Sequence, residues 1–341
     1  MNQGETSADA VQLRTQALWP QISAELSLPT DGVTFQRLRV NRRMQARRCA
    51  VMVRDTGGGA YVLRADYGEG GEAAFHKTLA RHAAAEEGLR SVMGIGVPKI
   101  LWQHPEKKIF LMEFIPGDTV FRELTAAELG LVSRAEVVSR AGRALAALHH
   151  CSRIGVRKFW PKAFLTRVST AAAEVRAGVR KVQRPKRFLG LCAHLHRAGR
   201  AARGHPFQGA VEHGDMHMRN MLLSGDEVWI IDFANHSGIY PQRDIANFWL
   251  ANGLSHLIAP EDEESTEAGF CMVAQADWVA FERGYGTQVS DDPVVRFFFA
   301  MRVFEAWIKQ GNQPDGLTAE QVTRRTERLE RVLRSLQASE A

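Results

Sequence analysis

The chain has 341 residues, of which 45% are hydrophobic and 24% are charged. This length exceeds that of a single small domain and allows two lobes, and the composition excludes a mainly disordered protein. The formal net charge of +6 favours anionic partners, such as nucleotides, phosphorylated glycans, nucleic acids or membrane lipids, without choosing among them.

The four cysteines (Cys49, Cys151, Cys192 and Cys271) are scattered, with neither a CxxC pair nor metal-ligand spacing. This pattern is typical of free thiols in a reducing compartment. The N-terminal sequence lacks the basic and apolar regions of a signal peptide. No stretch approaches the roughly 20 apolar residues that span a bilayer. We therefore expect a cytoplasmic protein.

The N-terminal third of the chain predicts a small α+β lobe. Residues 13–28 carry apolar side chains at helical spacing, and Pro20 either splits this helix or opens its main part. A long helix is expected over 72–93. The predicted strands are short, rich in Val and other strand formers, and lie at 33–40, 47–53, 60–66, 97–103 and 108–114.

The dipeptide Pro116-Gly117 ends this pattern, and the rest of the chain is mostly helical. The clearest apolar stripe runs through residues 134–151. A short hairpin at 222–233 is the exception. The predicted organisation is therefore an N-terminal extension with a helix (1–32), an N-lobe (33–114) and a C-lobe (115–341).

A polar turn before that hairpin contains Asp215 and Asn220, and Asp232 ends the second strand beside apolar residues. A carboxylate buried there must be paired or bind a cation. Because a hairpin folds back on itself, we expect Asp232 to come close to Asn220. Together they offer the hard oxygen ligands that Mg²⁺ takes, with substrate phosphates in other positions. Asp215 is then free to face an acceptor hydroxyl.

The stretch HGDMHMRN, followed by IIDF, resembles the catalytic loop and metal-binding segment of the aminoglycoside phosphotransferase and choline-kinase-like branch of the kinase superfamily. The pattern of that family matches at His213, Gly214, Asp215, His217, Asn220 and Asp232. With the N-terminal strands, the resemblance covers roughly residues 33–250. It implies a two-lobed, protein-kinase-like α+β fold, with a small β-rich N-lobe and a larger helical C-lobe, and it implies ATP and Mg²⁺ as cofactors.

The resemblance also implies roles for the residues of this loop. Asp215 would orient the attacking hydroxyl and accept its proton, and Asn220 and Asp232 would hold Mg²⁺ against the nucleotide phosphates. His217 would brace the loop. Asp244, in a segment that resembles the RDxA segment of the family, is expected to be a structural carboxylate that binds the backbone of the catalytic loop.

In the N-lobe, the resemblance places the nucleotide-binding groups on a strand, a helix and a hinge. Arg64 stands where the family pattern has a lysine, and its expected charge partner is Glu86 (or Glu87) on the following helix. Glu113 and Ile115 would mark the hinge, where backbone groups meet the adenine. The turn at 41–48 has no glycine, so we expect its arginines to supply charge to the phosphates in place of a glycine loop.

Three further features allow two interpretations each. The run 176–203, inside an insert at about 152–205, is basic and contains no acidic residue. It is either a solvated helical face or a docking surface for an anionic acceptor or membrane lipids, and no motif supports nucleic acid. The acidic run 261–267 is a loop or helix start, or a site for a cationic acceptor. The aromatic residues between 297 and 307 are expected in the core.

These observations predict an ATP-dependent phosphotransferase that phosphorylates a hydroxyl group of a small molecule or sugar, such as an amino sugar, a choline-like alcohol or a glycan. A protein kinase is disfavoured, because the interval between Asp232 and Asp244 is too short for a peptide-docking activation segment. The alternative is a catalytically weak, kinase-fold nucleotide-binding module, which Arg64 and the missing glycine loop suggest. No particular oligomeric state is predicted.

Overall fold

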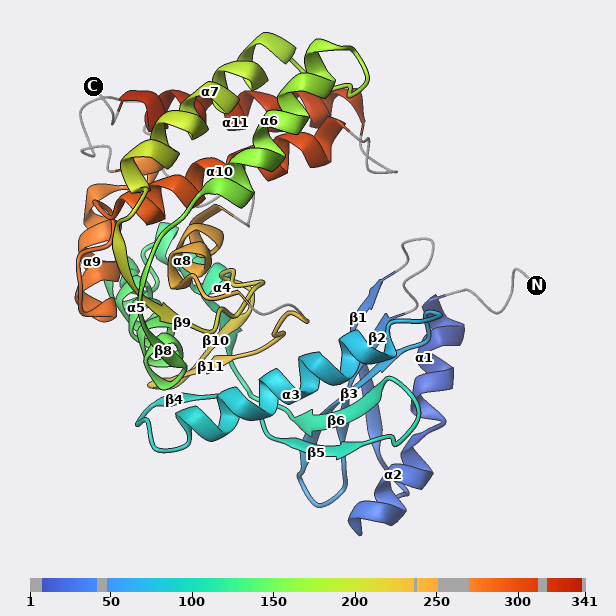
Figure 1. Cartoon of the computed structure of the whole chain (residues 1–341). Coiled ribbons are helices and arrows are strands. Elements are labelled where there is room, and N and C mark those ends of the chain that lie inside the picture. The colour runs from blue at the N-terminus through green and yellow to red at the C-terminus, as the bar shows by residue number, and fades with distance from the viewer. Residues whose placement is uncertain (1–7, 42–47, 236–237, 251–269, 312–317, 339–341) are drawn as a thin grey trace. The chain divides into compact units, whose positions relative to one another are not determined.

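The computed structural model describes residues 8–41, 48–235, 238–250, 270–311 and 318–338 (Figure 1). The chain divides into two compact units. The first comprises Met1–Gly117 and Ser224–His236, and the second comprises Asp118–Leu223 and Ser237–Ala341. The first unit therefore contains both the N-terminal strands and most of the hairpin that carries Asp232.

The first unit contains an antiparallel sheet with the strand order β1-β2-β3-β6-β5. The strands are β1 (Thr34–Asn41), β2 (Arg48–Arg54), β3 (Ala60–Asp66), β5 (Ile100–Gln103) and β6 (Ile109–Glu113). All five predicted strands are confirmed, with ends that shift by up to a few residues. The turn DTGGG joins β2 to β3, where Asp55 accepts hydrogen bonds from the Gly59 backbone (2.7 Å) and the Tyr61 hydroxyl (2.9 Å).

The helix expected over 13–28 is two helices, α1 (Ala8–Gln16) and α2 (Trp19–Leu26). Pro20 lies in the first turn of α2, where a missing N–H costs nothing, so it opens this helix and separates it from α1. The fully buried Trp19 packs on one face of the sheet with Val53 and Leu63. Because successive side chains of a strand point to opposite faces, Val62 packs on the other face, against α3 (Glu72–Leu89).

Helix α3 is attached to its surroundings at both ends. At its start, the buried Lys108 side chain donates to the carbonyl oxygens of Gly68 (2.5 Å) and Gly70. At its end, β4 (Ile95–Gly96) pairs in parallel with β11 (Glu227–Ile230). Gly96 has no side chain to separate these strands, and a Cβ there would lie 2.7 Å from the Trp229 ring. This pairing holds residues 224–236 in the first unit.

The second unit is mostly helical. Its helices are α4 (Val120–Glu128), α5 (Arg134–Cys151), α6 (Lys162–Arg176), α7 (Pro185–Ala202), α8 (Pro241–Leu250), α9 (Gln275–Tyr285), α10 (Pro293–Gly311) and α11 (Ala319–Ala338). Helix α5 has the predicted bounds, and the Ser133 side chain caps its start. Helices α5 and α9 approach backbone to backbone, because a Cβ on Gly284 would lie 1.9 Å from the Ser139 carbonyl oxygen.

Short strand pairs connect these helices. They are β7 (Asp118–Thr119) with β10 (Met221–Ser224), and β8 (Arg153–Lys158) with β9 (Pro206–Ala210). Helices α6, α7, α10 and α11 lie side by side, as Figure 1 shows. The aromatic residues of α10 are all buried there, which confirms them as core: Phe297, Phe298, Phe299, Phe304 and Trp307.

The basic run 176–203 occupies the end of α6, a loop and α7. Part of its charge is neutralised within the unit, since Arg180 pairs with Glu174 (2.6 Å) and Arg184 pairs with Glu327 and Glu330 of α11. The predicted phosphate contacts of Arg42, Arg43 and Arg47, and the acidic run 261–267, lie outside the described residues.

Two expectations about the whole chain concern thiols and membranes. All four cysteines are free, as predicted. Within the described ranges, no helix is both long and apolar enough to span a membrane.

Candidate active site

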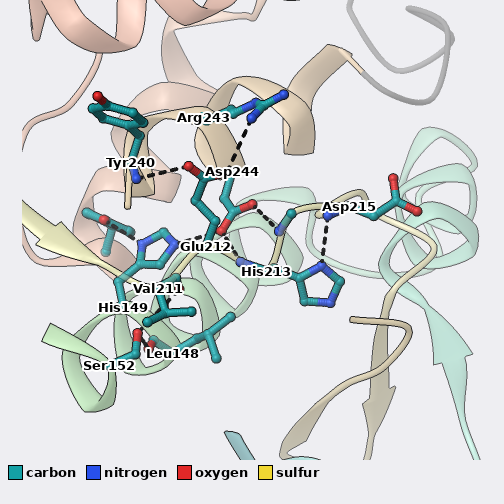
Figure 2. A network of polar contacts seen from close by, with 12 residues as sticks. Leu148, His149, Ser152, Val211, Glu212, His213, Asp215, Tyr240, Arg243 and Asp244 are labelled. Carbon is teal, nitrogen blue, oxygen red and sulfur yellow. Dashed lines mark hydrogen bonds and ion pairs between the residues drawn. The ribbon is translucent and has the colours of Figure 1, made fainter. Parts of the chain in front are cut away.

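Asp244 anchors the loop that carries Asp215. Its carboxylate is fully buried on α8 and accepts hydrogen bonds from the backbone N–H groups of His213 (2.6 Å) and Gly214 (3.0 Å). His149 of α5 contacts the same carboxylate through Nε2 (3.2 Å) and the Tyr285 hydroxyl through Nδ1 (2.9 Å). Figure 2 shows this network at the start of the loop. The prediction that Asp244 binds loop backbone is confirmed.

The charge of Asp244 is stabilised by these partners. Burial raises the pKa of its carboxyl group, but the hydrogen bond and charge of His149, the charge of His213 and the Gly214 N–H together outweigh burial, so the pKa is lowered. The carboxylate is therefore ionised at neutral pH and holds the two backbone donors as a charged acceptor.

Glu212 supplies a second buried carboxylate beside the loop. Its Oε1 accepts a hydrogen bond from the Tyr240 backbone (3.0 Å), and its Oε2 lies 3.7 Å from Nη1 of Arg243. The Glu212 N–H donates to the Gly238 carbonyl (3.2 Å). These contacts join the residue before the catalytic motif to the start of α8, so the loop is held by two neighbouring carboxylates.

The side chain of Asp215 extends away from this network. Its backbone N–H donates to Nδ1 of His213 (3.3 Å), and its carbonyl accepts from the Asn220 amide (2.9 Å). The side chain is 61% exposed and points away from the network in Figure 2. His217 braces the loop as predicted, because its Nδ1 accepts from Arg219 N–H (3.2 Å) and its carbonyl from Asn220 N–H (2.8 Å). The loop therefore fixes the backbone of Asp215 and exposes its carboxylate.

In the first unit, Asp232 follows β11 and forms an ion pair with Arg64 of β3. Its backbone is left-handed, with a φ of 63°, which is a strained conformation for a residue other than glycine. The next residues are fastened to α3: the Phe233 ring contacts the His82 ring at 5.6 Å, and Arg81 donates to the Ala234 carbonyl (2.7 Å). The strand end that carries Asp232 is thus fixed by β3 and α3.

The predicted ion pair between Arg64 and Glu86 is wrong. Arg64 has Asp232 as its carboxylate partner, whereas Glu86 pairs with Arg90 (3.3 Å), one turn further along α3. Glu87 also pairs with Arg90 (2.6 Å). A local i,i+4 pair within the helix has therefore replaced the predicted pair between helix and strand.

The hinge residues are placed by the sheet. The Glu113 carboxylate accepts from Lys99 N–H (2.9 Å), and Phe114 N–H donates to the Ala60 carbonyl (3.2 Å). Ile115 follows these two anchored residues. No hydrogen bond links its backbone N–H or carbonyl to the residues that the structure describes, so both groups are available to a ligand.

The residues expected to hold a cation have suitable oxygen atoms. Asn220 is buried, and its amide nitrogen is engaged with the Asp215 carbonyl, which leaves Oδ1 without a hydrogen-bond partner among the described residues. Asp232 adds a carboxylate. The described residues contain no cluster of three His, Cys, Asp or Glu side chains for a metal. The amide oxygen of Asn220 and the carboxylate oxygens of Asp232 are each hard oxygen ligands of the kind that Mg²⁺ takes.

Sequence reasoning missed Glu212, Arg243, Arg81 and His149 as supports of the site. Each acts on a segment distant in sequence, as when His149 of α5 contacts Asp244 of α8. The only local signal is a polar residue at an apolar helix position, as His149 is on the buried face of α5.

Comparisons with known proteins agree with this geometry. Residues 45–281 match the model of the phosphotransferase enzyme family. A choline/ethanolamine kinase family protein from Mesorhizobium loti is 16% identical with a TM-score of 0.60, and the match covers 96% of this chain and 98% of the other. A spectinomycin phosphotransferase is 15% identical (TM-score 0.57, coverage 95% and 98%), and an amicoumacin kinase is 13% identical (TM-score 0.54, coverage 94% and 95%). The sequence matches no curated protein.

The fold is the protein-kinase-like α+β fold that the sequence predicted. The family match makes the molecule a phosphotransferase. The family match covers more than half of the sequence. The chain therefore belongs to the phosphotransferase enzyme family.

Proposed function

We propose that this enzyme transfers the γ-phosphoryl group of ATP to a hydroxyl group of a small molecule or sugar, with Asp215 as its catalytic residue. The observation that carries the proposal is the state of Asp215: an exposed carboxylate on a backbone fixed by His213 and Asn220, in a loop anchored by the buried Asp244. Phosphoryl transfer depends mainly on positioning and charge stabilisation, which a rigid loop provides.

In the proposed reaction, the acceptor oxygen forms a bond to the γ-phosphorus, and the bond from that phosphorus to the β,γ-bridging oxygen breaks. The products are a phosphate ester and ADP. The acceptor proton passes to the Asp215 carboxylate and then to solvent, so the enzyme is returned unchanged. His217 lies 4.0 Å from the Asp215 carboxylate and helps to hold it.

The nucleotide contacts follow from the residues placed above. We assign Asn220 and Asp232 to Mg²⁺, Arg64 to the region of the phosphates, and the backbone at Glu113 and Ile115 to the adenine. When bound, Mg²⁺ supplies charge neutralisation on the phosphates. The spectinomycin phosphotransferase structure contains ADP, and the amicoumacin kinase structure contains AMP-PNP and Ca²⁺, which supports a nucleotide as donor.

The acceptor class is proposed by comparison with proteins of the same fold. The spectinomycin phosphotransferase is in complex with spectinomycin, a precedent for a small-molecule acceptor in this fold. An amino sugar, a choline-like alcohol and a glycan are the acceptors we propose to compare. We also propose a cytoplasmic location, because the free thiols suit a reducing compartment.

One observation favours a second function, that of a catalytically weak nucleotide-binding module. Arg64 forms an ion pair with Asp232, the carboxylate that we assign to the metal. A pair that persists after nucleotide addition would oppose metal binding and leave a regulatory module. The two functions differ in one measurable property, which is turnover.

The test is Mg-ATP-dependent ADP release with sugars, amino sugars, choline-like alcohols and glycan fragments as acceptors. We expect one acceptor class to accelerate release, and Asp215→Asn to abolish that acceleration while nucleotide binding is kept. Asp226→Asn, in the exposed turn between β10 and β11, is the matched control and should behave as wild type. Nucleotide binding with no turnover for any acceptor would favour the regulatory module, and turnover unaffected by Asp215→Asn would refute the assignment.

A further inference from the structure

The loop between α6 and α7 presents an exposed apolar side chain. Helix α6 ends at Arg176, and Gly178 follows in a left-handed conformation with a φ of 73°. The Gly178 N–H donates to the Val175 carbonyl (3.1 Å), and the Val179 N–H donates to the Glu174 carbonyl (2.9 Å). These two bonds form a Schellman motif, in which the residue at the position of Val179 commonly packs back on the helix. Here the facing residue is the charged Glu174, and Val179 is 78% exposed.

The rest of this loop is fastened to its own unit. The Arg180 side chain pairs with Glu174 (2.6 Å), and Arg184 pairs with two carboxylates of α11. Between them, the Gln183 carbonyl accepts a hydrogen bond from Nε1 of Trp307 in α10 (2.8 Å). The loop is therefore held in place by α6, α10 and α11, and the exposure of its valine is a property of the fold.

Four further cations lie within a few residues of this valine and have no ion-pair partner in the described part of the chain. They are Arg176, Lys181, Lys186 and Arg187, and all four are exposed. Residues 175–211 contain no acidic residue that could neutralise them locally. We call these four cations together with Val179 the α6–α7 tip, because they lie at the end where the two helices are joined.

Two of these cations occupy positions that a helix disfavours. Lys186 and Arg187 lie in the first turn of α7, directly after Pro185, and that turn contains no acidic residue. The N-terminus of a helix carries positive partial charge, so an anion stabilises it and a cation does not. The helix itself thus gains nothing from these two charges, whereas an external anionic partner would interact favourably with the side chains and with the helix end.

From these observations we propose that the α6–α7 tip docks on a membrane surface that contains anionic lipids. The four cations attract acidic headgroups, and the exposed valine side chain is stabilised by leaving water for the boundary between headgroups and acyl chains. Each basic residue near an anionic leaflet strengthens binding about fivefold. The proposal concerns a surface outside the catalytic loop and does not depend on the proposed function.

The composition of the tip favours lipid over nucleic acid. Proteins that bind single strands stack the bases on aromatic side chains, and residues 175–187 contain no aromatic residue. A duplex would be held through its phosphates, which offer no partner to the exposed Val179. An anionic membrane accommodates both the cations and the valine.

The experiment is co-sedimentation of the full chain with vesicles of phosphatidylcholine alone, or of phosphatidylcholine and phosphatidylserine in equal parts. We expect binding to the anionic vesicles only. Lys181→Gln and Lys186→Gln should each weaken it about fivefold. Val179→Asp should weaken it about tenfold, through the lost apolar contact and the added negative charge.

Two control variants match these changes at other exposed positions. Lys77→Gln removes an exposed lysine of α3, and Val279→Asp changes a valine of α9 that is 56% exposed. Both should bind as wild type does, and thermal unfolding followed by circular dichroism checks that every variant is folded. Equal binding to the two kinds of vesicle, or equal binding by Val179→Asp and Val279→Asp, overturns the proposal. Tighter binding of duplex DNA than of anionic vesicles at the same salt, lost in Lys181→Gln and Lys186→Gln, would identify a nucleic-acid surface and also overturn it.

Discussion

Replacing Asp244 tests whether the catalytic loop depends on one buried carboxylate. In Asp244→Ala, the N–H groups of His213 and Gly214 and the ring of His149 all lose the acceptor that this fully buried carboxylate provides. An unsatisfied buried polar group costs about 1–3 kcal/mol, and breaking a buried charged network about 3–5 kcal/mol. We expect a loss of about 3–5 kcal/mol in the free energy of unfolding of the second unit. Asp244→Asn keeps one acceptor oxygen and should lose about 2 kcal/mol.

The same change should displace Asp215, because the bonds to His213 and Gly214 set the path of the loop. A misplacement of about 1 Å can cost a hundredfold in rate. We therefore expect kcat to fall about a hundredfold in Asp244→Asn, measured as acceptor-dependent ADP release. Urea unfolding gives the stability. The control is Asp291→Asn, which removes an exposed pair with Arg296 and should change stability by at most about 1 kcal/mol.

The pH dependence gives an independent check. The pKa of Asp244 is lowered in the folded protein, since the contacts with His149, His213 and Gly214 outweigh burial. Its contribution is therefore complete above the unfolded pKa of about 3.9 and is lost as the pH falls through the lower folded pKa. The stability difference between wild type and Asp244→Asn should shrink below about pH 4. A difference that is the same at pH 3 and pH 7, or a variant with wild-type kcat, would refute this account of the loop.

Three further predictions concern other parts of the molecule. Arg64→Gln should raise the KM for Mg-ATP about tenfold, because it removes the charged contact that we propose with the phosphates, and Arg64→Lys should raise it less. The exposed Arg90→Gln is the control and should leave this KM unchanged. An unchanged KM in Arg64→Gln would contradict the proposed role of Arg64. Trp307→Ala should lower the free energy of unfolding, measured with urea, by about 3–5 kcal/mol, because the ring is fully buried and its Nε1 donates to the Gln183 carbonyl (2.8 Å). Trp160→Ala, which removes a half-exposed ring, is the control and should cost less. Equal losses in the two variants would contradict this packing. Burial raises the pKa of the Cys192 thiol to about 11, so iodoacetamide at pH 8 should alkylate it only after unfolding. Mass spectrometry measures the rate of alkylation at Cys192. Equal rates in native and unfolded protein would show that the thiol is accessible.

Local patterns predicted the elements and much of the loop. The apolar stripe of α5 and the strand formers of β3 depend on neighbours in sequence, so their bounds followed from the chain itself. The roles of Asp244 and His217 as supports also held, because both belong to short motifs.

Features that depend on distant segments were not predictable. The predicted partner of Arg64 was wrong, because the choice between Asp232 and Glu86 depends on where α3 and the end of β11 lie around β3. The parallel pairing of β11 with β4 leaves no signal in either segment.

The attachments of α3 limit how far this helix can move within the first unit. The helix is held at its start by Lys108, at its middle by the contact of His82 with the Pro98 carbonyl (2.6 Å), and beyond its end by the pairing of β4 with β11. Burial lowers the pKa of His82, so this contact involves a neutral ring at pH 7 and is insensitive to mild alkalinity. Control by a swinging helix would have to break all three attachments at once. An exchange of side-chain partners at Arg64, from Asp232 to a nucleotide phosphate, would leave all three attachments in place.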